Sequence, residues 1–269
     1  MRLSAVVFGM AVLGCRGDPV EVVPDTGSPT TDAVVEVEPC VTPAGFSGAC
    51  PDGMALIPGG CYRRVDGRDA IVAPFCLDIR EVTLGAYRDC SASGACVAAP
   101  TTITKYTGAT DEQVVAESKY CNAVNTGRAD HPINCVDFNQ AVAYCKFRGG
   151  ARLPTSDEWE WEARGGPAAS RYPWGDDPPT DQPCWAGVFR RGSTCVAGSS
   201  PKDQTVHGIR DMGGNLFEWV ATESPATAGW RVQLGGSFGT TDATVLAVGH
   251  WYDNMPEARM NTTGFRCAK

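Results

Sequence analysis

Thirteen cysteines are the side chains with the most evident chemistry in this 269-residue sequence. They lie at positions 15, 40, 50, 61, 76, 90, 96, 121, 135, 145, 184, 195 and 267. No CxxC pair occurs among them and the sequence contains only three histidines, so the ligand spacing of a structural zinc site is missing. The cysteines therefore favour disulfide bonds formed in an oxidising compartment.

A second candidate site is the stretch DMGGNLFEWV at residues 211–220. A tight turn explains the two glycines, because glycine enters positive-φ backbone freely, but it does not explain Glu218 between Phe217 and Trp219. A carboxylate in an apolar setting is costly unless a cation compensates its charge. The alternative is that Glu218 is a solvated residue at a strand edge.

Other reactive side chains have structural explanations. His250 has no second histidine near it in sequence and no carboxylate at metal-ligand spacing, which favours a structural role. The acidic residues between 157 and 162 are explained by a helix N-terminus and a solvated helix face. Five tryptophans could line a sugar or peptide groove, but packing beneath long loops is the favoured role. They are Trp159, Trp161, Trp174, Trp219 and Trp230.

The composition is that of an acidic globular protein. The hydrophobic fraction is 43% and the formal net charge is -8. Nucleic acids and anionic membrane faces attract clusters of Lys and Arg, which the sequence does not show, so neither is expected as a partner through charge. The length allows one large domain or two small ones.

The N-terminal sequence MRLSAVVFGMAVLGC resembles a bacterial lipoprotein signal, with Cys15 as the lipidated residue. An ordinary signal peptide with an incidental cysteine is the alternative. Without Cys15, twelve cysteines remain, which can close six disulfides. We predict a signal peptide at 1–14, lipidated Cys15 and a disordered tether at 15–39, and a folded domain at 40–269. The localisation would be the bacterial cell envelope, facing the periplasm or the cell surface, and the apolar run is too short to span a bilayer.

The elements that must position the candidate residues are few. Helices are predicted at 136–150 and 152–166, because each segment begins with a capping box and ends in glycines. The capping pairs are Asp137 with Gln140 and Thr155 with Glu158. Short extended segments are expected at 54–60 and 71–82, and Thr83 is expected to cap a short helix. After Gly166 no convincing helix follows, so the sequence indicates a loop-rich α+β fold held by disulfides.

Seven motifs, taken in order, resemble the formylglycine-generating enzyme family, whose domain is also called the sulfatase-modifying factor domain. They are MALIPGG, FCLDIREVT, HPINCVDFNQAVAYCKFRGGARLPTSDEWEWEARGG, YPWGD, HGIRDMGGNLFEWVA, RVQLGGSF and TGFRCA. The resemblance covers about residues 52–268. It implies a compact, loop-rich variant of the C-type lectin fold.

The resemblance also implies a chemistry that the sequence can test. Active members of the family use two cysteines, shortly after a GGSW motif, to bind copper(I) and to oxidise a sulfatase cysteine to formylglycine with O2. In this sequence GGSF precedes GTTDATV, so the two positions fall on Thr240 and Val245. Soft copper(I) requires soft ligands, and neither residue is a thiol. Copper is therefore not expected.

Six disulfides are predicted. The resemblance implies the bridge from Cys145 to Cys267, which ties a helix to the last strand. Proximity in the sequence suggests the other five, although sequence alone does not fix connectivity. These five are Cys40 with Cys50, Cys61 with Cys76, Cys90 with Cys96, Cys121 with Cys135, and Cys184 with Cys195.

The resemblance gives DMGGNLFEWV a further role as a calcium site. The family's ligand positions fall on Asp211, Gly214, Leu216 and Glu218, of which Gly214 and Leu216 would contribute backbone carbonyls. Calcium is a hard cation that takes carboxylate and carbonyl oxygens, so the residue types fit. A structural calcium ion would also explain why Glu218 lies between aromatic residues.

These observations together predict a lipid-anchored envelope protein with a non-catalytic binding or scaffolding domain. Its partner would be a protein or glycan of the cell envelope, and it would meet the membrane through the lipid. The alternative is an enzyme, either a formylglycine-generating oxidoreductase with another centre or another metal-dependent oxidase on the same fold.

Overall fold

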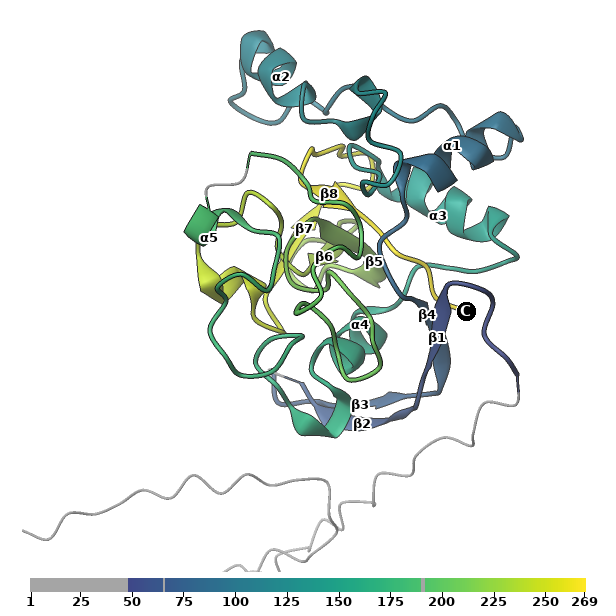
Figure 1. The fold of residues 1–269 in the computed structure, drawn as a ribbon, viewed down its shortest axis with the longest axis vertical. Coiled ribbons are helices and arrows are strands. Elements are labelled where there is room, and N and C mark those ends of the chain that lie inside the picture. The colour runs from purple at the N-terminus through teal and green to yellow at the C-terminus, as the bar shows by residue number, and fades with distance from the viewer. Residues whose placement is uncertain (1–47, 65, 190–191) are drawn as a thin grey trace, which may run out of the picture.

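The computed structural model describes residues 48–64, 66–189 and 192–269 (Figure 1). The predicted signal peptide, Cys15, the tether and Cys40 lie outside the described residues.

Three small sheets carry the strands. β1 (Met54–Ile57) pairs antiparallel with β4 (Phe75–Asp78), and β2 (Gly60–Arg63) pairs antiparallel with β3 (Asp69–Val72). The third sheet lies near the centre of the molecule in Figure 1 and has the order β7-β6-β5-β8. Its strands are β5 (Phe217–Glu223), β6 (Arg231–Leu234), β7 (Trp251–Asn254) and β8 (Thr263–Gly264). β5 and β8 run parallel, and the other neighbours run antiparallel.

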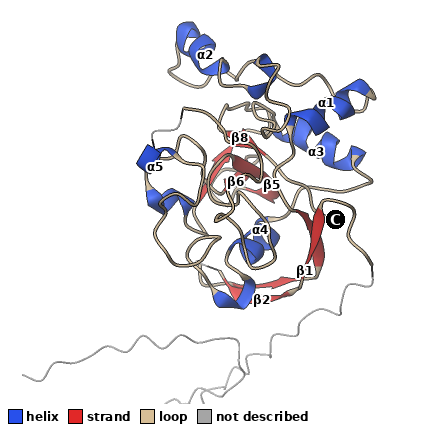
Figure 2. Ribbon diagram, viewed as in Figure 1, coloured by secondary structure: helices blue, strands red, loops and turns tan. Residues whose placement is uncertain are grey.

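Helices lie around this sheet, and long loops connect them (Figure 2). They are α1 (Leu84–Ala92), α2 (Asp111–Ser118), α3 (Phe138–Phe147), α4 (Ser156–Ala163) and α5 (Ala186–Phe189), with 3-10 turns at Asn122–Val124, Gly166–Ala168 and Ala243–Leu246. None of the described helices has the length and apolarity that a bilayer crossing requires. The loop-rich, C-type-lectin-like α+β fold expected from the sequence is confirmed.

Local capping signals begin the helices where the sequence predicts. Thr83 caps α1, and both predicted capping boxes form at α3 and α4. α2 was not predicted, although Thr110 and Gln113 form the same kind of capping box there. The signal was present in the sequence, but the short helix that follows it has only one buried residue, Ser118, and therefore no apolar stripe to mark it.

Two apolar clusters form most of the core, and β5 lies between them. Trp219 belongs to the cluster around α1 and α3, whereas the next residue, Val220, belongs to the cluster around α4 and the two small hairpin sheets. Successive side chains of a strand point to opposite faces, so one strand contributes to both clusters. The carboxylate of Glu218 therefore enters the protein interior on a rigid element.

Five disulfides join described cysteines, and four of them were predicted. Cys145–Cys267 joins α3 to the C-terminal segment across a sequence separation of 122 residues. The other confirmed bridges are Cys90–Cys96, Cys121–Cys135 and Cys184–Cys195.

The fifth disulfide corrects two predictions. Cys50 pairs with Cys76, so the predicted pairs Cys40–Cys50 and Cys61–Cys76 are both wrong. Cys61 lies on β2 and faces Ile71 of β3, whereas Cys76 lies on β4 and faces Leu56 of β1, in a different sheet. The segment that leads into β1 brings Cys50 to Cys76, and Cys61 is also disulfide-bonded. Sequence proximity failed here because strand pairing, rather than chain distance, decides which cysteines meet.

Candidate functional site

The loop after β6 holds Thr240, to which the family resemblance assigns the position of the first copper ligand. Gly235 and Gly236 open this loop with φ of 99° and 77°, and a Cβ on Gly236 would lie 2.6 Å from a methyl carbon of Leu246. Only glycine fits there. The chain then turns so that Thr240 Oγ1 accepts a 2.9 Å hydrogen bond from the Ser237 amide, and the Thr240 amide donates to the Ser237 carbonyl at 3.0 Å. The buried hydroxyl of Thr240 thus closes a turn.

The second copper position offers no donor atom. Val245 lies in the 3-10 turn Ala243–Leu246 and presents hydrocarbon. Every cysteine that the structure describes is disulfide-bonded, so the described residues supply no thiolate in place of the missing pair. Copper(I) needs soft sulfur ligands, and this donor set does not fit it.

The stretch DMGGNLFEWV leads into a buried ion pair. Arg266 Nη2 donates to Glu218 Oε1 at 2.6 Å and Arg266 Nε donates to Oε2 at 2.8 Å, while Trp159 Nε1 donates to Oε2 at 2.8 Å. Arg266 is fully buried and also donates to the carbonyls of Asp78 and Arg210. The cation that compensates Glu218 is therefore a guanidinium, which the sequence reasoning did not identify.

Glu218 and Arg266 are not alone in this interior. Three further carboxylates that form no ion pair with a described residue, those of Glu81, Asp203 and Asp211, are buried near Arg266. Glu81 accepts from Asn215 Nδ2 at 2.6 Å and from the Leu216 amide at 3.1 Å. Burial, and then the neighbouring charge of Asp211, raises the pKa of Glu81 well above its ordinary value.

Asp203 and Asp211 are the least satisfied of these acids. Gln204 and Arg210 form an isolated antiparallel bridge, which places residues 203 and 211 opposite each other. Asp211 Oδ2 accepts from the Gly198 amide, but Asp211 Oδ1 and both carboxylate oxygens of Asp203 are buried with no hydrogen-bond partner among the described residues. Burial raises the pKa of Asp211 to about 6, and burial with the charge of Asp211 raises the pKa of Asp203 well above its ordinary value.

The four predicted calcium ligands are thus only partly free to hold a cation. Glu218 is engaged by Arg266, while Gly214 and Leu216 form the curled backbone between Asp211 and β5. Gly214 has φ 112°, and a Cβ there would lie 2.8 Å from the Cys184 carbonyl oxygen. No three His, Cys, Asp or Glu side chains in the described ranges are arranged to hold a metal ion as they stand. The oxygens that fit a hard cation are those of Asp203 and Asp211, and the sequence reasoning missed Asp203 because it lies outside the motif.

The remaining chemical candidates from the sequence have structural roles. Trp159, Trp161 and Trp219 are buried, and their indole N–H groups donate to Glu218, the Pro58 carbonyl and the Val136 carbonyl, so these three tryptophans do not line a groove. The prediction of a solvated acidic face on α4 is wrong for Glu162. Its buried carboxylate accepts from the Thr205 hydroxyl and lies 2.7 Å from His207 Nδ1.

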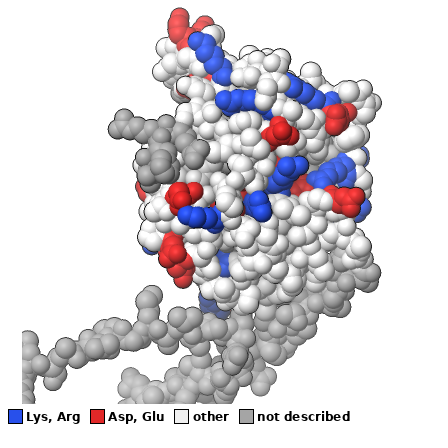
Figure 3. Space-filling model, viewed as in Figure 1, with Lys and Arg blue, Asp and Glu red and all other residues white. Residues whose placement is uncertain are grey.

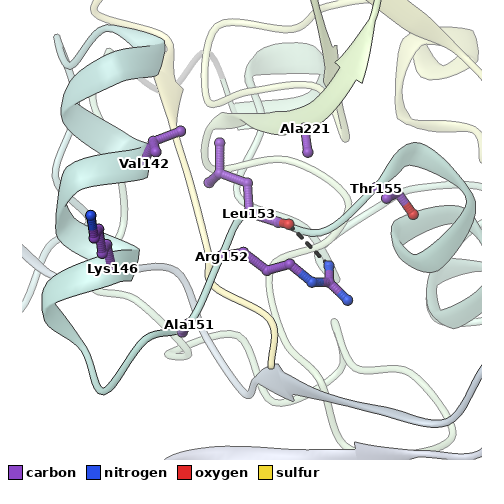
Figure 4. A pocket seen from close by; sticks show the side chains of 7 residues that line it. All are labelled: Val142, Lys146, Ala151, Arg152, Leu153, Thr155 and Ala221. Carbon is purple, nitrogen blue, oxygen red and sulfur yellow. Dashed lines mark hydrogen bonds between the residues drawn. The ribbon is translucent and has the colours of Figure 1, made fainter.

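A pocket of about 380 Å³ lies between α3, the loop before α4, and β5 (Figure 4). Val142, Leu153 and Ala221 contribute hydrocarbon to its wall. Arg152 lines it too, but its guanidinium is held by both carboxylate oxygens of Glu158, each at 2.6 Å. The pocket therefore offers an apolar surface rather than a reactive group.

The fold agrees with the comparison to known families. A family model described as the sulfatase-modifying factor enzyme 1-like domain matches residues 46–269, and the chain belongs to this family. The resemblance seen in the sequence is thereby confirmed.

Two curated relatives illustrate the range of the family. The chain is 38% identical over 150 residues to "Inactive C-alpha-formylglycine-generating enzyme 2" of Mus musculus, covering 51% of this chain and 48% of that protein. It is 35% identical over 170 residues to "Formylglycine-generating enzyme" of Streptomyces coelicolor, covering 53% of this chain and 54% of that protein. The chain spans about half the length of these relatives.

Solved structures support the fold alone. PvdO from Pseudomonas aeruginosa superposes with a TM-score of 0.62 at 21% identity, covering 80% of this chain and 93% of that one. CarF superposes with a TM-score of 0.61 at 19% identity, covering 81% of this chain and 98% of that one.

Proposed function

We propose that this protein is a lipid-anchored component of the bacterial cell envelope whose sulfatase-modifying factor domain is a non-catalytic binding or scaffolding module. The observation that carries the proposal is the state of the copper loop. A buried threonine hydroxyl and a valine occupy the two thiol positions, and the described cysteines are all in disulfides. The similarity to a relative named as inactive supports this interpretation.

The envelope localisation and the lipid rest on the sequence pattern around Cys15, and the disulfides support an oxidising compartment. A protein or glycan of the envelope is the proposed partner. Trp251, Tyr252 and Met255 support this choice, because they are exposed on or beside β7, which is an edge strand. Exposed aromatic and apolar side chains at one edge are typical of interaction surfaces.

We propose in addition that a structural calcium ion binds beside the DMGGNLFEWV stretch, through Asp211 and backbone carbonyls of the predicted set. Asp203 would be a further ligand in place of Glu218. The unpartnered buried oxygens of Asp203 and Asp211 support the proposal, since a hard cation would satisfy them and offset the excess of buried acids.

Incubation of the purified protein with copper(I), O2 and a peptide carrying the sulfatase cysteine motif tests the non-catalytic function. We expect no aldehyde in the mass spectrum of the peptide, whereas the Streptomyces coelicolor relative serves as positive control. Appearance of the aldehyde with the wild-type protein would show that the domain is an enzyme.

A double variant tests whether the two missing thiols are the reason that copper(I) binding is not expected. Thr240→Cys with Val245→Cys restores two thiols to the loop, and we expect it to bind copper(I) more tightly than the wild type in a competition titration. Metal analysis of the wild-type protein distinguishes the non-catalytic function from the enzymatic alternative. Stoichiometric copper or iron would favour a metal-dependent oxidase.

A further inference from the structure

Four arginines line one small pocket beside β2, β3 and α4, in the lower part of Figure 1. The pocket has a volume of about 210 Å³, and its arginines are Arg63, Arg64, Arg164 and Arg171. Such a concentration is unexpected in a chain with a formal net charge of -8. On the face shown in Figure 3, by comparison, basic and acidic side chains are interspersed.

Two of the four guanidinium groups already have carboxylate partners. Arg63 Nε lies 3.1 Å from Asp69 Oδ1, and Arg64 Nε donates to Asp157 Oδ1 at 2.6 Å. Arg164 and Arg171 form no ion pair with any residue in the described ranges. These two residues therefore have no direct carboxylate partner, although the charge of Glu160 in the pocket wall interacts with that of Arg164.

Both of these guanidinium groups are held in place by aromatic rings. The Arg164 Cζ atom lies 4.7 Å from the centroid of the Tyr62 ring, and Arg171 Cζ lies 5.3 Å from that of Tyr172. Arg164 Nη1 also donates to the Arg63 carbonyl at 3.1 Å, while Arg164 Nε is buried with no partner among the described residues. Stacking restrains a long side chain before any ligand arrives, which lowers the entropy lost on binding.

The acid in the pocket wall does not neutralise them directly. Glu160 Oε2 accepts from the Tyr62 hydroxyl at 3.3 Å, and no contact within ion-pair distance joins it to Arg164 or Arg171. Ser170 lies between the two arginines in the sequence and also lines the pocket. Two restrained guanidinium forks and a hydroxyl in one concave site are the donors that oxyanions require.

We propose that this pocket binds an oxyanion group of a ligand, between Arg164 and Arg171. The volume admits a phosphate, sulfate or carboxylate together with part of the group that carries it. The pocket adjoins the end of the loop that carries Val245, because Val248 lines it and Tyr172 packs in one cluster with Leu246. It includes neither of the two thiol positions and none of the four buried acids around Arg266, so the proposal does not rest on the proposed function.

Isothermal titration of the full chain at constant ionic strength tests the pocket with two probes. Inorganic phosphate represents a tetrahedral oxyanion and glucuronate represents a sugar carboxylate. We expect saturable binding of at least one probe, and the preferred probe identifies the source of the oxyanion. If neither probe shows saturable binding at millimolar concentrations, the proposal is overturned.

Variants assign the binding to the two arginines. Arg171→Gln is the first choice, because Arg171 is exposed and its guanidinium makes no hydrogen bond to a described residue, so we expect the variant to fold. We expect about tenfold weaker binding or more, and a further loss when Arg164→Gln is added. Arg80→Gln removes the same charge from an exposed arginine outside the pocket and serves as the control. An equal loss in that control would mean that general charge, rather than this pocket, attracts the anion.

Discussion

Arg266 is the residue on which the buried acids depend. It lies fully buried, with Glu218 at 2.6 Å, and its charge also lowers the cost of ionising Glu81 and Asp211. Arg266→Gln would leave these carboxylates without their cation. We expect a loss of about 3–5 kcal/mol in the free energy of unfolding, measured by urea denaturation.

Arg68→Gln is the matched control for this experiment. Its ion pair with Asp66 lies at the surface, and exposed pairs contribute roughly 0–1 kcal/mol. If Arg266→Gln were as stable as the Arg68 variant, the buried acids would not rely on the guanidinium.

The pH dependence of stability follows from Asp211. Burial raises its pKa from 3.8 to about 6, so the folded state holds a proton that the unfolded state releases at lower pH. The stability that the folded protein gains from this bound proton is fully present below about pH 4. It is lost as the pH rises through about 6. In calcium-free buffer we expect urea midpoints to fall across that interval, and Asp211→Asn to flatten the curve. A wild-type midpoint that rises from pH 4 to 6 would contradict the expectation.

Bound calcium would oppose this loss of stability at higher pH, because it would stabilise the ionised carboxylates of Asp203 and Asp211. We expect added calcium to raise the melting temperature at pH 7 and EDTA to lower it, since a ligand of the folded state alone stabilises that state. Asp203→Asn should remove the response. Glu218→Gln should lower stability but keep the response, because Arg266 engages Glu218. A melting temperature unaffected by EDTA would remove the case for calcium.

At the scale of elements, the disulfides differ in what they constrain. Cys145–Cys267 closes a loop across 122 residues, whereas Cys90–Cys96 spans six. The chain-entropy estimate gives about 5 kcal/mol for the long loop and about 2 kcal/mol for the short one. Thermal melts of Cys145→Ala/Cys267→Ala and Cys90→Ala/Cys96→Ala should therefore differ clearly. Equal losses would indicate that local packing, rather than loop length, sets the contribution.

At the scale of the whole molecule, the proposed lipid on Cys15 would decide where the domain resides. If Cys15 carries the lipid, Cys15→Ser should move the protein from the membrane fraction to the soluble fraction without changing its melting temperature. Fractionation followed by mass spectrometry of the N-terminal peptide measures both the location and the lipid. A soluble wild-type protein would contradict the anchor.

The sequence by itself determined the features that arise from contacts within a few residues. The capping boxes at Asp137 and Thr155 close over three residues, and Thr83 caps α1 by accepting from the Ala86 amide, three residues further on. The ordered motifs also gave the family and the Cys145–Cys267 bridge. The capping signals survive in the sequence because each one depends on its own local chemistry, whereas the bridge across 122 residues came from the family resemblance.

Only the tertiary structure decided which distant side chains meet. Arg266 and Glu218 lie 48 residues apart, Glu81 and Asn215 lie 134 apart, and Cys50 reaches Cys76 through the pairing of β1 with β4. A buried charge takes whichever counter-charge the packing brings to it, and residue type alone does not reveal whether that is a metal ion or a guanidinium. The sequence therefore predicted a cation beside Glu218, while the fold determined that the cation is Arg266.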